Sequence, residues 1–243
     1  MHSPPVSAHP LPPASPDCHV VELRQYTLHP GRRDALIELF DGEFIETQEA
    51  VGIRVLGQFR DLGDDNRFVW LRGFADMAVR GLALPAFYGG PAWASHRDAA
   101  NATMWDSDDV LLLRPAWPGA ALPGPSAHRA PRGATAVPPG VLLASVFHLK
   151  APAGTELLAQ CRGPLSERLC SAGARTLAWY VTEDSPNSFP RLPVREGEAV
   201  LVSLALFEGA ADPGDWSTVL APWLARPTQR LRLAPTARSS LHA

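Results

Sequence analysis

Cysteine is scarce in this chain of 243 residues, and its scarcity limits the kinds of site that can be expected. The three cysteines are Cys18, Cys161 and Cys170. They are too few and too scattered for a disulfide framework, and no two are spaced as CxxC, so a structural zinc site is not expected. This usage favours a reducing, cytoplasmic setting.

The sequence also lacks long apolar runs and a large excess of charge of either sign. No run approaches the roughly 18 consecutive apolar residues that a membrane span needs. Lys and Arg number 22 against 25 Asp and Glu, which gives a net charge of −3. That balance leaves too few cations for a basic face. We expect no membrane span and no nucleic-acid partner; homo-oligomerisation stays open.

Several catalytic signatures are missing as well. There is no GxGxxG or GxxxxGK[ST] loop, which removes the usual cradles for dinucleotides and triphosphates. There is no GxSxG elbow, no HExxH or HxxxH pair, and no carboxylate cluster at ligand spacing. The sequence therefore predicts no nucleotide cofactor and no intrinsic metal site.

Proline is abundant and divides the chain. The 25 prolines gather near the N-terminus and in the middle of the sequence. Because proline lacks an amide donor and restricts the residue before it, such stretches do not join helices or central strands. We predict a disordered extension at 1–17, a first domain at 18–116, a Pro/Gly/Ala-rich linker at 117–139, a second domain at 140–237 and a tail at 238–243.

The two halves resemble each other when the sequence is shifted by 121 positions. Leu36 then meets Leu157, and Gly52 meets Gly173. The correspondence breaks after Asn187, where the second half inserts about a dozen residues. Each half is predicted to follow the order βαββαβ, which is the ferredoxin-like plan. The predicted fold class is α+β, with two tandem ferredoxin-like repeats packed sheet to sheet.

The start of the first predicted strand carries a family pattern. Residues 22–31 read ELRQYTLHPG, which resembles the opening E-L-R-x-Y-x-L-x-P-G of the NIPSNAP family. The blocks FYGGPAWASHRDAANATMWDSDDVLLLRP and NSFPRLPVREGEAVLV resemble its bacterial branch. The family is similar to the dimeric α+β barrel group, so the resemblance implies a barrel around a central cavity. That group includes cofactor-free monooxygenases, isomerases, cyclases and haem-handling enzymes, whereas animal NIPSNAP members are described mainly as interaction proteins.

Polar residues share one face of the first predicted strand. Period-two alternation places Glu22, Arg24 and Tyr26 on one side and Val21, Leu23 and Gln25 on the other. Two further strands extend the polar face: Arg54, Leu56 and Gln58 from the second, and Trp70 and Arg72 from the third. Because helices should cover the apolar side, we expect the polar side to look into the barrel.

Glu22 lies between Arg24 and Arg72 in this arrangement, and buried charges are costly unless they are paired. The set can act as a structural ion pair that keeps the sheets in register. Alternatively, it can form an anion-recognising pocket in which an arginine fork binds a carboxylate or an enolate. In the second reading Glu22, Arg24, Gln58, Trp70 and Arg72 bind substrate.

The second half has mostly lost the polar set. At the 121 shift Gln58 meets Trp179, and Phe147 falls on the corresponding first strand. Phe147 and Trp179 would supply an apolar wall opposite the polar groups, as an asymmetric pocket requires. Alternatively, the second half lost its polar residues by sequence drift, because its core no longer needs the charges.

His96 and Tyr26 are the candidate catalytic residues. His96 lies in a predicted helix and titrates near neutral pH, so it could act as a general base or as an axial haem ligand. A structural hydrogen bond is the alternative role for this histidine. His148 is a second histidine that could face the cavity. Haem is the weaker cofactor hypothesis, because no distinctive ligand motif accompanies either histidine.

Two functions from different classes remain. In the first, the chain binds or transforms a small, partly hydrophobic anionic or enolisable molecule in the barrel cavity, as a cofactor-independent isomerase, cyclase or monooxygenase would. In the second, the chain is an interaction or scaffold protein whose barrel is only a structural core. A cavity lined by Tyr26, Arg24 and Arg72 would support the first function, and a filled barrel the second.

Overall fold

The computed structural model describes residues 18–125, 129–209 and 213–243. The predicted disordered extension, residues 1–17, lies outside the described residues. The elements of the first half are β1 (Val20–Leu28), α1 (Arg33–Leu39), the π-helical η1 (Phe40–Phe44), α2 (Ile45–Glu49), β2 (Arg54–Asp61), β3 (Arg67–Phe74), α3 (Met77–Tyr88), α4 (Pro91–Asn101) and β4 (Met104–Pro115). Those of the second half are β5 (Val141–His148), α5 (Thr155–Gln160), the π-helical η2 (Cys161–Leu165), α6 (Ser166–Ser171), β6 (Thr176–Thr182), β7 (Val200–Phe207), the 3-10 segment η3 (Thr218–Trp223) and β8 (Gln229–Pro235).

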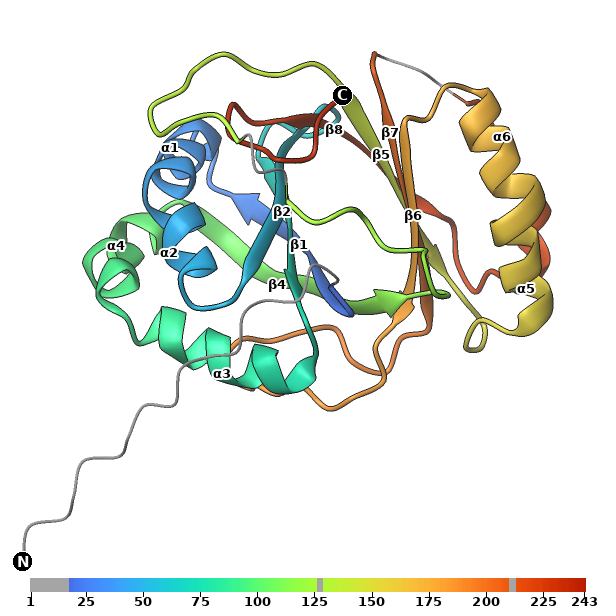
Figure 1. The fold of residues 1–243 in the computed structure, drawn as a ribbon, viewed down its shortest axis with the longest axis horizontal. Helices are drawn as coiled ribbons and strands as arrows, with labels where there is room; N and C mark the ends of the chain where they lie inside the picture. Colours follow the sequence, from blue (N-terminus) through green and yellow to red (C-terminus); the bar gives the residue numbers. More distant parts are fainter. Residues whose placement is uncertain (1–17, 126–128, 210–212) are drawn as a thin grey trace, which may run out of the picture.

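The strands of the described chain form a closed antiparallel barrel in the order β1-β3-β2-β8-β5-β7-β6-β4. The halves meet at two short seams, where Phe59–Asp61 of β2 pairs with β8 and Leu113–Pro115 of β4 pairs with β6. Helices α1 to α4 lie outside the barrel on one side, and α5 and α6 lie outside it on the opposite side (Figure 1). The fold is therefore a mixed α+β fold built on a closed eight-stranded barrel.

The barrel interior is apolar and is filled from both halves. Val21 and Leu23 of β1 face inward and belong to the same buried cluster as Leu142 of β5 and Val202 of β7. Alternating apolar residues on every strand supply this core, as expected for strands with one inward face. The two seams contain few backbone pairs, and the shared apolar core adds side-chain contacts between the halves.

The predicted direction of the polar face is wrong. Glu22 and Arg72 point away from the barrel interior, toward the helices of the first half, where Arg80 of α3 contacts Glu22. Closing the barrel excludes water from its inner face, so only apolar side chains can fill that face without partners. The outer face can accommodate charge because the helices bring polar side chains to it. Alternation in the sequence separates two faces but does not say which of them faces inward.

An irregularity in β2 reverses the predicted alternation. The pairing of β2 with β3 shifts register between Val55 and Gly57, as at a β-bulge. Leu56 consequently packs inside the barrel, whereas Gln58 reaches toward the helices, so the two residues do not share a face. A Cβ atom on Gly57 would lie 2.7 Å from the ring of Phe59, which explains why glycine occupies this position.

The segment that joins β4 to β5 contains neither helix nor strand in its described residues. It is nevertheless packed against both halves. The backbone N–H of Leu122 donates to the hydroxyl of Tyr180 at 2.8 Å, and Arg129 forms an ion pair with Glu49 at 2.8 Å. The connection is therefore fixed to α2 on one side and to β6 on the other.

Candidate functional site

Four charged side chains meet between the sheet and the helices of the first half. We call them the Glu22 cluster: Glu22, Arg24, Arg72 and Arg80. Glu22 Oε2 accepts from Arg24 Nη1 at 2.6 Å and from Arg72 Nε at 2.7 Å, while Oε1 accepts from Arg80 Nε at 2.7 Å. All four side chains are 0% exposed. One carboxylate therefore contacts three guanidinium groups in the protein interior.

Local geometry explains how the cluster assembles. Glu22 and Arg24 are two residues apart in β1, so they share a face, and Arg72 stands directly opposite Glu22 in the pairing of β1 with β3. Arg80 comes from the buried stripe of α3, which also contains Ala83, Leu84 and Phe87. The sequence analysis missed Arg80. Its signal is a charged residue within an apolar stripe of helical spacing.

The cluster holds an excess of positive charge. Although burial alone raises the pKa of Glu22, the charges of Arg72, Arg24 and Arg80 hold this pKa well below its ordinary range. Burial lowers the pKa of Arg80 in spite of Glu22, and the neighbouring guanidinium groups add to that effect. Nη2 of Arg80 is buried and has no hydrogen-bond partner among the described residues. The cluster thus retains both charge and donor capacity beyond what Glu22 satisfies.

Aromatic side chains surround the guanidinium groups. Those of Arg24 and Arg72 lie 5.5 Å and 5.1 Å from the centre of the Trp70 ring, within the range of cation–π contacts. Arg24 Nε donates to the hydroxyl of Tyr26 at 3.0 Å, and Arg72 Nη1 donates to the hydroxyl of Tyr88 at 3.4 Å. The structure therefore brings four of the predicted site residues together: Glu22, Arg24, Tyr26 and Arg72. Trp70, another residue of the predicted set, lies beside them.

Gln58 belongs to a buried polar group with Asp41 of η1 and Thr236, which follows β8. Its Nε2 donates to Asp41 Oδ1 at 3.5 Å, and the hydroxyl of Thr236 donates to the same oxygen at 3.3 Å. Burial raises the pKa of Asp41 to about 6, against the opposing effects of Thr236 and Arg238. The sequence analysis missed Asp41, because its burial depends on a contact with the tail that no local pattern marks.

Phe147 and Trp179 do not contact the Glu22 cluster. They belong to the buried layer between the sheet and the helices of the second half. The ring of Trp216 lies 5.7 Å from that of Phe147 and 6.0 Å from that of Trp179, and Trp179 Nε1 donates to Ser166 Oγ at 2.9 Å. The outer faces of the two halves point in opposite directions, so the expected apolar wall lies across the barrel from the charges.

His96 lies near the surface and is not part of the cluster. Its side chain is 35% exposed, and its Nε2 is 3.7 Å from Glu43 Oε2. It lines an open groove between α1 and α4 together with Arg32 and Glu38. The structure thus separates His96 from Tyr26, its predicted catalytic companion.

His148 lies at the end of β5 in a second group of charges. Its Nδ1 is 2.9 Å from Arg226 Nη2 and 3.4 Å from Glu198 Oε2. Burial and the charge of Arg226 lower the pKa of His148 below its ordinary value. This histidine faces a charged rim outside the barrel core.

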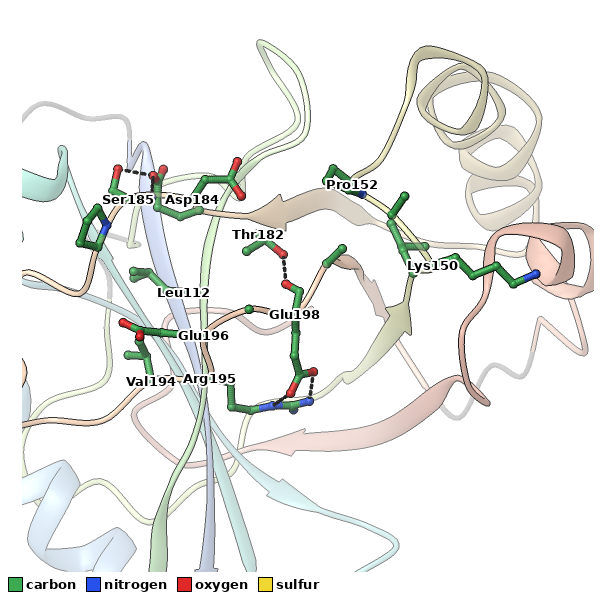
Figure 2. A pocket seen from close by; sticks show the side chains of 16 residues that line it. Leu112, Lys150, Pro152, Thr182, Asp184, Ser185, Val194, Arg195, Glu196 and Glu198 are labelled. Atoms are coloured by element: carbon green, nitrogen blue, oxygen red, sulfur yellow. Dashed lines mark hydrogen bonds and ion pairs between the residues drawn. The ribbon is translucent and has the colours of Figure 1, made fainter.

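A groove of about 650 Å³ opens beside this rim (Figure 2). The segment between β6 and β7 supplies much of its lining, including the ion pair of Arg195 with Glu198. Asp184 and Glu196 on the same segment are exposed to solvent. None of the predicted site residues lines this groove.

The described part of the chain contains neither a cluster of metal ligands nor a membrane-spanning helix. No group of three or more His, Cys, Asp and Glu side chains in it could hold a metal ion. No helix in it has both the length and the apolar character needed to cross a bilayer.

Solved structures of other proteins are similar to this chain, and the first two described here share its fold. A protein from Fusobacterium nucleatum, provisionally named a monooxygenase, has 8% identity and a TM-score of 0.55, with 89% of this chain and 92% of that chain covered. An anthrone oxidase-like protein has 14% identity and a TM-score of 0.55, with 93% and 97% covered. A NIPSNAP family protein of unknown function from Agrobacterium tumefaciens has 22% identity and a TM-score of 0.37, with 40% and 87% covered.

Comparisons of sequence give a narrower result. No curated protein matches the chain. Residues 21–117 match the NIPSNAP family, and this range runs from the start of β1 to just beyond the end of β4. The matched range includes all four members of the Glu22 cluster. The first half of this chain is therefore similar to the NIPSNAP family over the range that holds the cluster.

Proposed function

We propose that the chain binds a small, partly hydrophobic anion at the Glu22 cluster, between the sheet and α3. The observation that carries this proposal is the composition of the cluster, which has three buried guanidinium groups and one buried carboxylate. An uncompensated buried charge is costly, and a bound anion would offset the excess. Arg80 Nη2, which lacks a hydrogen-bond partner among the described residues, is the donor most directly available to it.

The aromatic surroundings support a planar ligand. A guanidinium group close to the rings of Trp70 and Tyr88 suits a carboxylate or enolate that is conjugated with a ring. Burial raises the pKa of Tyr26, so its phenol keeps its proton at neutral pH. Because the Tyr26 oxygen accepts from Arg24, its own O–H is left to donate to a ligand oxygen.

An enzymatic role would follow from the same groups. Arginines that stabilise an anion also stabilise an enolate as it forms, and Tyr26 could hold or return a proton at the enolate oxygen. The name of the anthrone oxidase-like protein supports chemistry on an enolisable ketone, and that of the Fusobacterium nucleatum protein, provisionally a monooxygenase, supports an oxygenation. The chain would then act as a cofactor-independent isomerase, cyclase or monooxygenase.

The filled barrel favours a second candidate function. Apolar side chains of both halves occupy the interior, where the sequence analysis had placed the cavity. In this reading the chain is an interaction or scaffold protein, and the Glu22 cluster is a structural ion network. Haem is a weaker third candidate, since the His96 side chain is only partly exposed and His148 contacts Arg226 and Glu198.

We also propose that the two halves are ferredoxin-like repeats of one ancestral unit, with domains at 18–116 and 140–237. The strand orders β2-β3-β1-β4 and β6-β7-β5-β8 support this, because they place equivalent strands in equivalent positions. The π-helical segments η1 and η2 begin at Phe40 and Cys161, which are 121 positions apart.

A titration with matched ligands tests the proposed binding function. We expect 2-naphthoate to bind, detected by calorimetry, and the neutral 2-naphthamide not to bind. Arg72→Met should lower the affinity for naphthoate by about 30-fold or more, as is usual when one member of a buried charge pair is truncated. Arg97→Met, which removes a guanidinium that is 59% exposed, is the control and should bind normally. A folded wild-type protein that binds no aromatic or aliphatic carboxylate would favour the scaffold reading.

A further inference from the structure

The segment between β6 and β7, residues 183–199, belongs to the second half but reaches the Glu22 cluster in the first. Arg80 Nη1 donates to Asn187 Oδ1 and to Ser188 Oγ, each at 2.9 Å. These contacts join residues that are 107 and 108 positions apart in the chain. One face of the cluster is therefore completed by the other half of the molecule.

The same segment also places an aromatic ring beside the cluster. Phe189 stacks on Tyr88 with ring centres 5.9 Å apart and an angle of 14° between the planes. Phe189 and Val194 both pack against the buried layer of the first half. Tyr88 in turn accepts from Arg72, so the stacked pair is directly connected to the guanidinium groups.

Contacts within the segment and with the first half anchor it. Asn187 Nδ2 donates to the carbonyl of Leu192 at 3.0 Å, and the N–H of Phe189 donates to Asn187 Oδ1 at 3.1 Å. Farther along, the N–H of Arg195 donates to the carbonyl of Val110 at 2.8 Å. The side-chain amide of Asn187 thus stabilises the turn of the segment and also binds Arg80.

We propose that Asn187 and Ser188 are positioning residues and that Phe189 determines ligand specificity at the Glu22 cluster. By holding Nη1 of Arg80, the first two residues fix the guanidinium so that Nη2 is directed at the ligand. Phe189, stacked on Tyr88, forms a flat wall that favours planar aromatic anions over saturated ones of similar size. This inference rests on the proposed function and names the class of ligand.

A difference in loop length between the halves accounts for a site in only one of them. The first half joins its equivalent strands, β2 and β3, by a short turn between Asp61 and Arg67, whereas β6 and β7 are separated by residues 183–199. The short turn contacts the second half at the seam, where the N–H of Leu62 donates to the carbonyl of Arg232 at 2.8 Å, and it is too short to reach the helices of that half. The long segment of the second half therefore covers the Glu22 cluster, whereas the short turn of the first half does not cover the equivalent face of the second.

Two anions that differ only in planarity test the inference. Benzoate and cyclohexanecarboxylate carry the same charged group on a flat ring and on a puckered ring. We expect the wild-type protein to prefer benzoate, and Phe189→Ala to lower benzoate affinity about three- to tenfold while leaving cyclohexanecarboxylate affinity unchanged. Glu196→Ala, an exposed change on the same segment, is the control and should alter neither affinity.

The positioning role has its own variants. The double variant Asn187→Ala with Ser188→Ala should weaken both anions about equally, by about tenfold, because Arg80 is released. Ser188→Thr keeps the hydroxyl and should bind as the wild type does. Amide exchange should show that α3 remains protected in the double variant. Equal loss of both anions in Phe189→Ala, or normal affinities in the double variant, would overturn the inference, and a wild-type protein that binds neither anion would instead overturn the proposed function itself.

Discussion

Glu22 and Arg72 stand directly opposite each other in the pairing of β1 with β3, and the Glu22 carboxylate accepts from Arg72 Nε at 2.7 Å. The two residues are not equivalent in this pair. Glu22 also accepts hydrogen bonds from Arg24 and Arg80. Arg72, in addition to its contact with Glu22, has hydrogen-bonding contacts with Gln48 and Tyr88. Replacing one member should therefore have a different result from replacing the other.

Glu22→Gln should be strongly destabilising. It leaves three buried guanidinium groups without a counter-charge, and breaking a buried pair in this way costs about 3–5 kcal/mol. Chemical denaturation should show the loss in the free energy of unfolding. Glu208→Gln, which removes one side of an exposed pair with Arg175, should cost under about 1 kcal/mol. Equal losses of stability in the two variants would contradict the claim that the three buried guanidinium groups need the negative charge of Glu22.

Arg72→Met should retain the fold with a smaller loss of stability than Glu22→Gln. Glu22 would keep Arg24 and Arg80 as partners, and an apolar side chain of similar length can replace a buried cation at little cost. Thermal unfolding followed by circular dichroism measures this. A melting temperature that falls further in Arg72→Met than in Glu22→Gln would contradict the shared role of Glu22.

Acid should destabilise the protein through Glu22. Its pKa is lowered in the folded protein, while in the unfolded chain it lies near about 4.3, so the unfolded state binds more protons between these values. Stability from this group is complete above the unfolded pKa and is lost as pH falls below it. We expect a steep fall in the free energy of unfolding below about pH 5. The fall should be shallower in a Glu22→Gln variant that still folds.

Asp41 should act in the opposite direction. Its pKa is raised to about 6 in the folded protein, so the folded state binds more protons than the unfolded state does between about pH 4 and 6. The contribution of Asp41 to stability is present at low pH and is lost as pH rises through 6. Asp41→Asn should remove this loss and make the protein more stable at pH 7 than the wild type. A lower stability of Asp41→Asn at pH 7 would show that the carboxylate is needed by Arg238 or Thr236.

Ser145 and Ser203 offer a test of buried polar groups in the second half. They face each other across β5 and β7, and their hydroxyl oxygens are buried without a hydrogen-bond partner among the described residues. Replacing both by alanine should be neutral or stabilising, because two unsatisfied groups are removed. Ser239→Ala is the contrasting change, since Ser239 accepts from the N–H of Gln58 at 3.2 Å, and it should cost about 1 kcal/mol. Stabilities at one pH compare the three proteins, and a large loss in the double alanine variant would contradict the expectation.

The sequence is a good guide to the elements of the first half and a poor guide to their faces. Hydrophobic alternation locates β1, and it correctly groups Glu22 with Arg24 and Arg72. It does not reveal which face is enclosed, because that depends on closure by strands far along the chain. The contact between Arg80 and Asn187 could not be predicted from local sequence patterns for the same reason, because a helix of one half and a loop of the other bring the two residues together.

Closure of the barrel depends on two seams of three residue pairs each, β2 with β8 and β4 with β6. Each half alone would expose two unpaired strand edges, which readily accept foreign strands. In this chain each edge strand pairs with a strand of the same polypeptide. The local concentration of that partner strand is therefore set by the connecting segment and does not fall when the protein is diluted. Dilution, which separates barrels made from two subunits, therefore leaves this barrel closed and its edges protected.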